Sequence, residues 1–236
     1  MVATRQRHAA FTTATGESIS VGSHREVFLP GDWSGRFFYR EISDVRVFEI
    51  QPRGHGLLIL DHGSPTKVTD EWVGDGGRFM IAHDPDTEAN LAIWSGRHHD
   101  LVSWVMGPVP MRRQVQKLYD ALSWRDTPSG ISVSMRYPNR GGRIEQQEYL
   151  VGTTDGALLS VRDPRSFGDM TPKGAGAKTR NGEVWKRRIE RSDGTVGSYY
   201  ALGTPTALTV YYPKGAGVAE SVDLDVLDNL SVSWGT

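Results

Sequence analysis

The chain has 236 residues, of which 38% are hydrophobic and 23% charged, and its formal net charge is −1. This is the composition of a globular protein with a sizeable core, and the near-neutral balance excludes whole-molecule attraction to nucleic acid or anionic lipid. The chain has no cysteine, which excludes disulfides, thiolate metal sites and cysteine nucleophiles.

Short alternating or apolar segments, separated by Gly, Pro, Asn and Asp clusters, dominate the chain and predict antiparallel strands. Turn sequences such as "GDGG" (74–77) supply residues that accept the positive φ of tight connections. In chain order the expected strands span residues 25–30, 36–41, 44–50, 56–60, 67–73, 78–83, 89–94, 101–105, 131–137, 145–152, 157–163, 183–191, 196–202 and 207–213.

Two segments predict helices. In residues 110–123 an apolar stripe at helical spacing follows Pro110, which suits a helix start, and it consists of Met111, Val115, Leu118 and Leu122. In residues 219–230 the shared apolar face consists of Val222, Val226, Leu227 and Leu230. Because two short helices cannot cover fourteen strands, we expect most of the sheet to be covered by other sheet.

These elements predict a mainly β fold, an antiparallel β-sandwich or a partly closed β-barrel with two short α-helices. The two predicted helices end alike, in "YDALSW" (119–124) and "LDNLSVSW" (227–234), and each is expected to lead into a short closing strand. This recurrence favours two related β-rich lobes, residues 1–125 and 126–236, with one continuous domain as the alternative.

All seven histidines lie in the first 99 residues, and several stand beside acids. Two or three imidazoles with a carboxylate bind zinc, manganese or iron, and imidazole suits proton transfer near neutral pH. The metal-binding candidates are His62, His83, Asp84, His98 and His99, and the catalytic candidates are His62, His83, His98, His99 and Asp100. The alternative is that these residues form turns, because His-Asp and Asp-Pro pairs are common there and no motif such as HExxH is present. The strand pattern predicts that His62 and His83 both end strands at one rim of a sheet.

Two further features have a structural and a functional interpretation. The glycine-rich "TPKGAGAKT" (171–179) lacks the glycine register of a phosphate loop, so we expect a connecting loop. Residues 171–191 carry an excess of basic side chains around Trp185. This is the composition of a polyanion patch, but on an alternating strand the charges divide between two faces, as edge strands often show.

The leading functional hypothesis is a non-catalytic binding or assembly module that acts through protein–protein contacts, with a protein partner or self-association. The alternative is an enzyme without an organic cofactor, a cyclase, isomerase or hydrolase that uses the candidate histidines in a β-barrel pocket. The aromatic-rich strands also allow a small apolar ligand as a partner. No cofactor is expected, with a divalent metal ion left open, and neither nucleic acid nor a membrane is an expected partner. No segment has the length of a signal peptide core or of a membrane span, so we expect a cytoplasmic protein, particle-associated if it belongs to an assembly.

Overall fold

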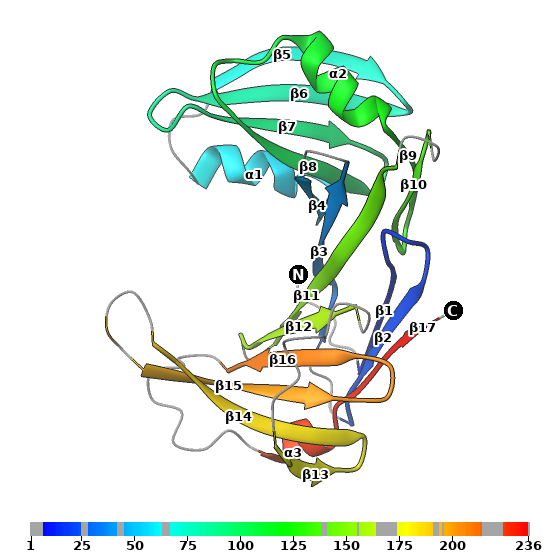
Figure 1. Ribbon diagram of the computed structural model, residues 1–236, viewed down its shortest axis with the longest axis vertical. Helices are drawn as coiled ribbons and strands as arrows, with labels where there is room; N and C mark the ends of the chain where they lie inside the picture. Colours follow the sequence, from blue (N-terminus) through cyan, green and yellow to red (C-terminus); the bar gives the residue numbers. More distant parts are fainter. Residues whose placement is uncertain are drawn as a thin grey trace. The chain divides into compact units, whose positions relative to one another are not determined.

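The computed structural model describes residues 7–24, 28–41, 45–62, 67–137, 141–154, 156–163, 174–190, 194, 196–213 and 224–235. Within these residues the chain forms seventeen strands and three helices, which confirms the mainly β prediction (Figure 1). Contacts divide the chain into two compact units. Unit 1 comprises residues 1–11, 17–33 and 148–236, and unit 2 comprises residues 12–16 and 34–147.

Unit 1 holds two antiparallel sheets. The smaller has the strand order β1-β2-β17, with β1 (His8–Thr12), β2 (Ser18–Gly22) and β17 (Ser231–Gly235). The larger has the order β13-β14-β15-β16-β12-β11. Its strands are β11 (Arg143–Thr153, of which residues 148–153 belong to unit 1), β12 (Leu158–Arg162), β13 (Ala177–Thr179), β14 (Gly182–Glu190), β15 (Val196–Gly203) and β16 (Leu208–Tyr212).

The two sheets of unit 1 enclose an apolar core. Phe11 of β1 lies 5.3 Å from Tyr149 of β11 between ring centroids, and Trp234 of β17 lies 5.8 Å from the same ring. Residues of β17 alternate between exposed and buried, as expected for a strand with one face on a core. This is the sandwich arrangement that the alternating strands predict.

Helix α3 (Leu224–Asp228) is the described part of the helix predicted over residues 219–230, and residues 219–223 lie outside the described residues. Leu227 and Leu230 are buried in the core of unit 1. The strand β17 follows α3, as predicted.

Unit 2 is built on an antiparallel sheet of strand order β3-β4-β8-β7-β6-β5 and a hairpin of β9 and β10. The segments expected at 25–30 and 36–41 belong to one long strand, β3, with residues 25–27 outside the described residues. Asp75 and Gly76, with φ of 49° and 73°, form the predicted tight turn between β5 and β6. The strands are β3 (Phe28–Arg40, of which residues 34–40 belong to unit 2), β4 (Val45–Pro52), β5 (Lys67–Gly74), β6 (Gly77–Asp84), β7 (Ala89–Ser95), β8 (His99–Met106), β9 (Leu122–Thr127) and β10 (Gly130–Met135).

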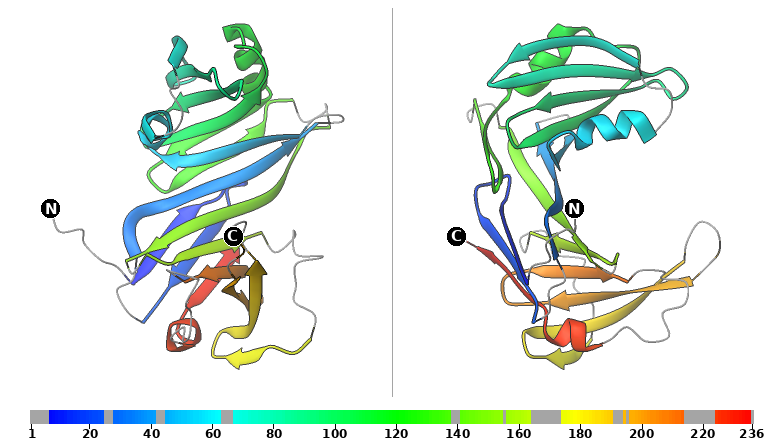
Figure 2. Two further views of the ribbon diagram at one scale, coloured as in Figure 1. Left: turned by 90° about the vertical axis from the view of Figure 1, so that its left-hand side faces the viewer. Right: turned by 180° about the vertical axis from the view of Figure 1, so that it is seen from behind.

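Helices α2 (Arg112–Asp120) and α1 (His55–His62) cover opposite faces of the unit 2 sheet (Figures 1 and 2). The predicted helix over 110–123 is confirmed in α2, and its main anchor is Tyr119. The Tyr119 ring packs edge-on against Phe48 and Phe79, and its hydroxyl donates to the carbonyl oxygens of Ala92 and Leu101 at 2.9 and 3.0 Å. These contacts fix α2 to the middle of the sheet.

The prediction of a strand over residues 56–60 is wrong, because this segment lies in α1. The amide N–H groups of Gly54 and Gly56 both donate to Asp100 Oδ2 at 2.9 Å. The Asp100 carboxylate therefore supplies the acceptor that a helix N-terminus needs, and Ile59 packs on a small apolar cluster of β6, β7 and β8. A short apolar run has no period that distinguishes strand from helix, and here a tertiary contact decides.

Helix α2 of unit 2 leads into β9, and helix α3 of unit 1 leads into β17. Residues 126–147 belong to the same compact unit as residues 34–125. The relatedness of two lobes, and a boundary between residues 125 and 126, stay predictions.

Candidate functional site

The candidate His83 is part of a hydrogen-bond chain that holds the connection between β8 and α2. His83 Nδ1 lies 2.9 Å from Asn90 Oδ1, and Asn90 Nδ2 donates to the carbonyl oxygens of Val105 and Gly107 at 3.1 and 2.8 Å. Its neighbour Asp84 caps the next turn, since its carboxylate accepts from the Asp86 amide and the Thr87 hydroxyl. Both side chains are therefore engaged in local structure.

The candidates His98 and His99 bind one carboxylate of the β9 strand. His99 Nδ1 lies 2.8 Å from Asp126 Oδ1, and the His98 amide donates to Asp126 Oδ2 at 2.8 Å. The carbonyl of His99 also accepts from the Gly96 amide at 2.9 Å. A Cβ at Gly96 would lie 2.5 Å from Asp126 Oδ2, so glycine is required where this turn approaches β9.

Asp100 is fully buried and serves the start of α1. One of its oxygens accepts the two glycine amides, and the other has no hydrogen-bond partner among the residues that the structure describes. A Cβ at Gly56 would lie 3.0 Å from Asp100 Oδ2 and 3.2 Å from Ile93 Cγ2. The close approach of α1 to the sheet therefore depends on glycine at position 56.

The structure does not bring the candidate histidines to one place. His83 pairs with Asn90 and Asp100 pairs with Ser95, so the two groups are separated along β7 by roughly 17 Å at about 3.3 Å per residue. His62 ends α1 instead of a strand, and its side chain lies outside the described residues. No group of three His, Asp or Glu side chains in the described ranges could hold a metal ion. A metal or acid–base role for these residues stays a prediction.

The glycine-rich and basic features of unit 1 lie partly outside the described residues. Of the 171–179 segment, Gly174 accepts a hydrogen bond from Trp185 Nε1 at 2.9 Å, and Ala177–Thr179 form β13. Lys186 lies over the Tyr200 ring, whereas Arg187 is the cross-strand neighbour of Tyr199. Successive basic side chains of β14 therefore point to opposite faces, as the alternating pattern predicts.

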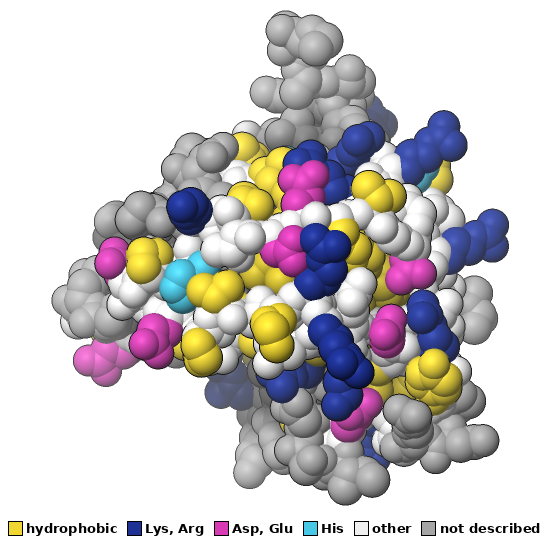
Figure 3. Space-filling model, turned by 90° about the horizontal axis from the view of Figure 1, so that it is seen from above, with side chains coloured by type: hydrophobic (Ala, Val, Ile, Leu, Met, Phe, Trp, Pro, Cys, Tyr) yellow, Lys and Arg dark blue, Asp and Glu magenta, His cyan; other side chains and the backbone are white. Residues whose placement is uncertain are grey.

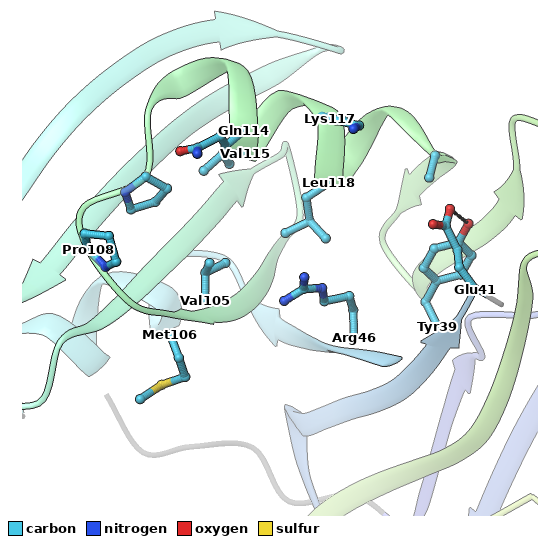
Figure 4. Close-up of a pocket in the computed structure, with 12 residues that line it drawn as sticks. Tyr39, Glu41, Arg46, Val105, Met106, Pro108, Gln114, Val115, Lys117 and Leu118 are labelled. Carbon is cyan, nitrogen blue, oxygen red and sulfur yellow. Dashed lines mark hydrogen bonds between the residues drawn. The ribbon is translucent and has the colours of Figure 1, made fainter. Parts of the chain in front are cut away.

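A hollow of about 430 Å³ lies between α2 and the sheet face that α2 covers (Figure 4). A second hollow of about 250 Å³ shares four of its lining residues, so the two form one elongated groove along the helix, here named the α2 groove. Its lining residues are Tyr39, Glu41, Arg46, Val105, Met106, Pro108, Pro110, Gln114, Val115, Lys117, Leu118, Asp120, Ala121 and Tyr137.

Helix anchoring explains the position of the groove. Val115 and Tyr119 are buried against the sheet, and Leu118, one step around the helix, is half-buried and left to line the hollow. On the sheet side, Tyr39 of β3 and Arg46 of β4 are cross-strand neighbours and share one face. The wall of apolar side chains near Met106 is held by the Asn90 contacts to the β8–α2 connection.

The groove has apolar walls and charged side chains at defined points. The Arg46 guanidinium extends into the hollow between Val105 and Leu118 (Figure 4). Glu41 Oε1 accepts a hydrogen bond from the Tyr39 hydroxyl at 2.8 Å. Lys117 forms no ion pair with any residue that the structure describes.

The sequence interpretation missed Arg46, Tyr39 and Glu41 as residues of a common site. These residues carry no motif, and only strand pairing and the placement of α2 bring them together. The apolar stripe predicted in residues 110–123 does contain one indication of the groove. Leu118 lies at the edge of this stripe and not at its centre. A groove against a sheet forms at the border of the apolar face of an amphipathic helix, where apolar side chains meet solvent.

A scan of the chain against protein-family models finds no match, and a search of the curated proteins finds none. Among solved structures, the chain is similar to one described as the immunity protein TplEi of T6SS from Pseudomonas aeruginosa complexed with "L" peptide. The identity is 12%, the match covers 97% of this chain and 99% of that chain, and the TM-score is 0.31. A similarity of this size assigns neither a fold nor a function. In the described part of the chain, no helix has the length and apolar character needed to cross a membrane.

Proposed function

We propose that this protein is a non-catalytic binding module that holds an extended segment of a partner protein in the α2 groove. The observation that carries the proposal is the elongated shape of the groove, in which two hollows follow one helix and share lining residues. An extended peptide fills such a shape, with one side chain in each hollow. Sites between a helix and a sheet are a recurring place for peptide recognition.

Exposed apolar side chains at the end of the groove support a protein partner. Met106 and Met111 are each 70% exposed and Val109 is 44% exposed, and all three lie in or beside the β8–α2 connection. Exposed apolar residues that adjoin a groove mark interaction sites more often than scattered ones do, and methionine adapts to partners of varied shape. A partner that covered them would remove this apolar surface from water.

The enzyme alternative has less support from the described geometry. Of the candidate histidines whose side chains the structure describes, His83, His98 and His99, none lines the α2 groove. His99 and Asp100 are buried, and both are engaged in contacts that hold backbone in place. An acid–base group must reach the proton that it transfers, and neither residue faces the groove. The alternative stays a prediction, and we put forward no second function.

Selection of peptides on the whole protein tests the proposal. A random peptide display library is selected against the immobilised protein, and synthetic copies of the selected peptides are titrated by calorimetry. We expect peptides that bind the wild type and lose at least tenfold in affinity, about 1.4 kcal/mol, with Leu118→Glu or Val105→Glu. The matched control is Leu58→Glu, which changes an exposed leucine of α1 on the opposite face of the sheet.

Comparison of the affinities of these variants distinguishes binding in the groove from binding elsewhere on the surface. Circular dichroism spectra of all variants establish that each is folded. Peptides that bind Leu118→Glu and Val105→Glu as tightly as the wild type would contradict the proposal. So would peptides that lose affinity equally with Leu58→Glu.

A further inference from the structure

Helix α2 carries four charged side chains, and two of them are engaged elsewhere in unit 2. Arg112 donates to both carboxylate oxygens of Asp70, at 3.0 and 2.6 Å, and its guanidinium lies over the Trp72 ring. Asp120 lies 3.7 Å from Arg136. The remaining two are Arg113 and Lys117.

Arg113 and Lys117 are exposed, and they are spaced i, i+4 on the same side of the helix. Neither has an ion-pair partner among the residues that the structure describes. Like charges at this spacing destabilise a helix by about 0.2–0.5 kcal/mol. The arrangement is therefore unfavourable for α2 itself and favourable for an anionic partner.

Two cations, Arg46 and Lys117, and two carboxylates, Glu41 and Asp120, line the α2 groove, and Asp120 is paired with Arg136. Lys117 lines both hollows, and Arg46 enters the larger one from the sheet. Glu41 is the carboxylate of the larger hollow, and it already accepts the Tyr39 hydroxyl. Seen from above, the face that carries α2 and β5 shows Lys and Arg side chains interspersed with Asp and Glu, beside exposed apolar ones (Figure 3).

We propose that the segment bound in the α2 groove is acidic, with an apolar side chain next to a pair of carboxylates two residues apart. This inference rests on the proposed function. Residues i and i+4 of a helix lie about 6 Å apart along its axis, and alternate residues of an extended peptide lie about 6.8 Å apart on one side. Two carboxylates of an Asp/Glu-x-Asp/Glu segment thus match Arg113 and Lys117, and the apolar side chain packs against Leu118.

The peptides selected from the random library provide the test. We expect them to contain an apolar residue beside two acids, and to bind more weakly when each Asp is replaced by Asn and each Glu by Gln. Two exposed ion pairs predict a loss of about two- to thirtyfold. The double variant Arg113→Glu, Lys117→Glu should reduce the affinity at least as much, and the wild-type affinity should fall as salt is added.

A second double variant with the same change in net charge serves as the matched control. Lys186→Glu, Arg188→Glu reverses two exposed cations on β14, which are not among the lining residues of the groove, and should leave affinity unchanged beyond a small general effect. Circular dichroism verifies that both double variants are folded.

Failure of this inference and failure of the proposed function give different results. Peptides that require Leu118 but lack acids, or that bind the Arg113→Glu, Lys117→Glu variant as tightly as the wild type, would overturn the acidic segment and leave the groove in place. Peptides that never depend on Leu118 would overturn both.

Discussion

His99 and Asp126 form a buried hydrogen-bonded pair, with Nδ1 of His99 2.8 Å from Oδ1 of Asp126 and side chains that are 6% and 8% exposed. The second oxygen of Asp126 accepts the amide of His98. One carboxylate therefore ties the β7–β8 turn to β9. In the described structure, the paired histidines after Trp94 hold two parts of the chain together.

Replacement of Asp126 by alanine should destabilise the protein. Both the His99 imidazole and the His98 amide would lose their acceptor inside the fold, and a buried group without a partner costs about 1–3 kcal/mol. Urea unfolding followed by tryptophan fluorescence measures the change. Asp86→Ala, at an exposed turn position, should shift the free energy of unfolding by no more than about 0.5 kcal/mol. Equal effects of the two variants would contradict this prediction.

Replacement of Asp100 by alanine should loosen α1 selectively. The amides of Gly54 and Gly56 would lose their shared acceptor, and α1 has only eight residues, too few to be stable without tertiary contacts. We expect faster hydrogen exchange at the α1 amides, with little change in α2. Unchanged protection of α1 would show that the apolar contacts of Ile59 suffice to hold the helix.

The Asp70–Arg112 pair should make a salt-sensitive contribution to stability that depends on pH. The side-chain hydrogen bond from Arg112 lowers the pKa of Asp70 below its usual value. Because the pKa is depressed in the folded state, the contribution is present above the usual carboxyl pKa and is lost as the pH falls through the lowered value. NMR titration of the Asp70 carboxyl should show its pKa rising toward the usual value in Arg112→Ala. A pKa that does not respond to this substitution would refute the pairing.

Tyr119→Phe should weaken the attachment of α2. It removes a hydroxyl that donates to two buried carbonyl oxygens, which predicts a loss of about 1–3 kcal/mol in urea unfolding. Burial also raises the pKa of Tyr119 well above its usual value. A raised pKa stabilises the folded state below the usual tyrosine pKa near 10, and this stabilisation is lost as the pH rises beyond it. Ultraviolet titration should therefore show one tyrosine that ionises only on unfolding, and this signal should be absent from Tyr119→Phe.

Much of the strand pattern could be predicted from local sequence. The alternation in residues 67–73 and 78–83 and the "GDGG" between them predict a hairpin, and the structure has β5 and β6 there. The helical stripe predicts α2, and the closing strands after α2 and α3 are present as β9 and β17. Strands β1, β2 and β13 were missed, because each is short and carries at most two large apolar side chains.

The candidate site could not be predicted in the same way. Adjacent residues such as His99 and Asp100 alternate across a strand, so one faces β9 and the other faces α1. Histidines that are close in sequence were grouped as a site, although the length of β7 separates His83 from the others.

By itself, the sequence determined the mainly β class, the position of α2 and most of the turns, because these depend on the period of apolar residues and on backbone preferences within a few residues. Only the tertiary structure decided that residues 55–62 form a helix, since the acceptor for its first amides is Asp100 on a strand that follows later in the chain. It also decided where the groove lies. Tyr119 fixes α2 on the sheet, and this placement brings Leu118 and Lys117 opposite Arg46 and Tyr39. Contacts between distant residues determine that relationship, and no local pattern contains them.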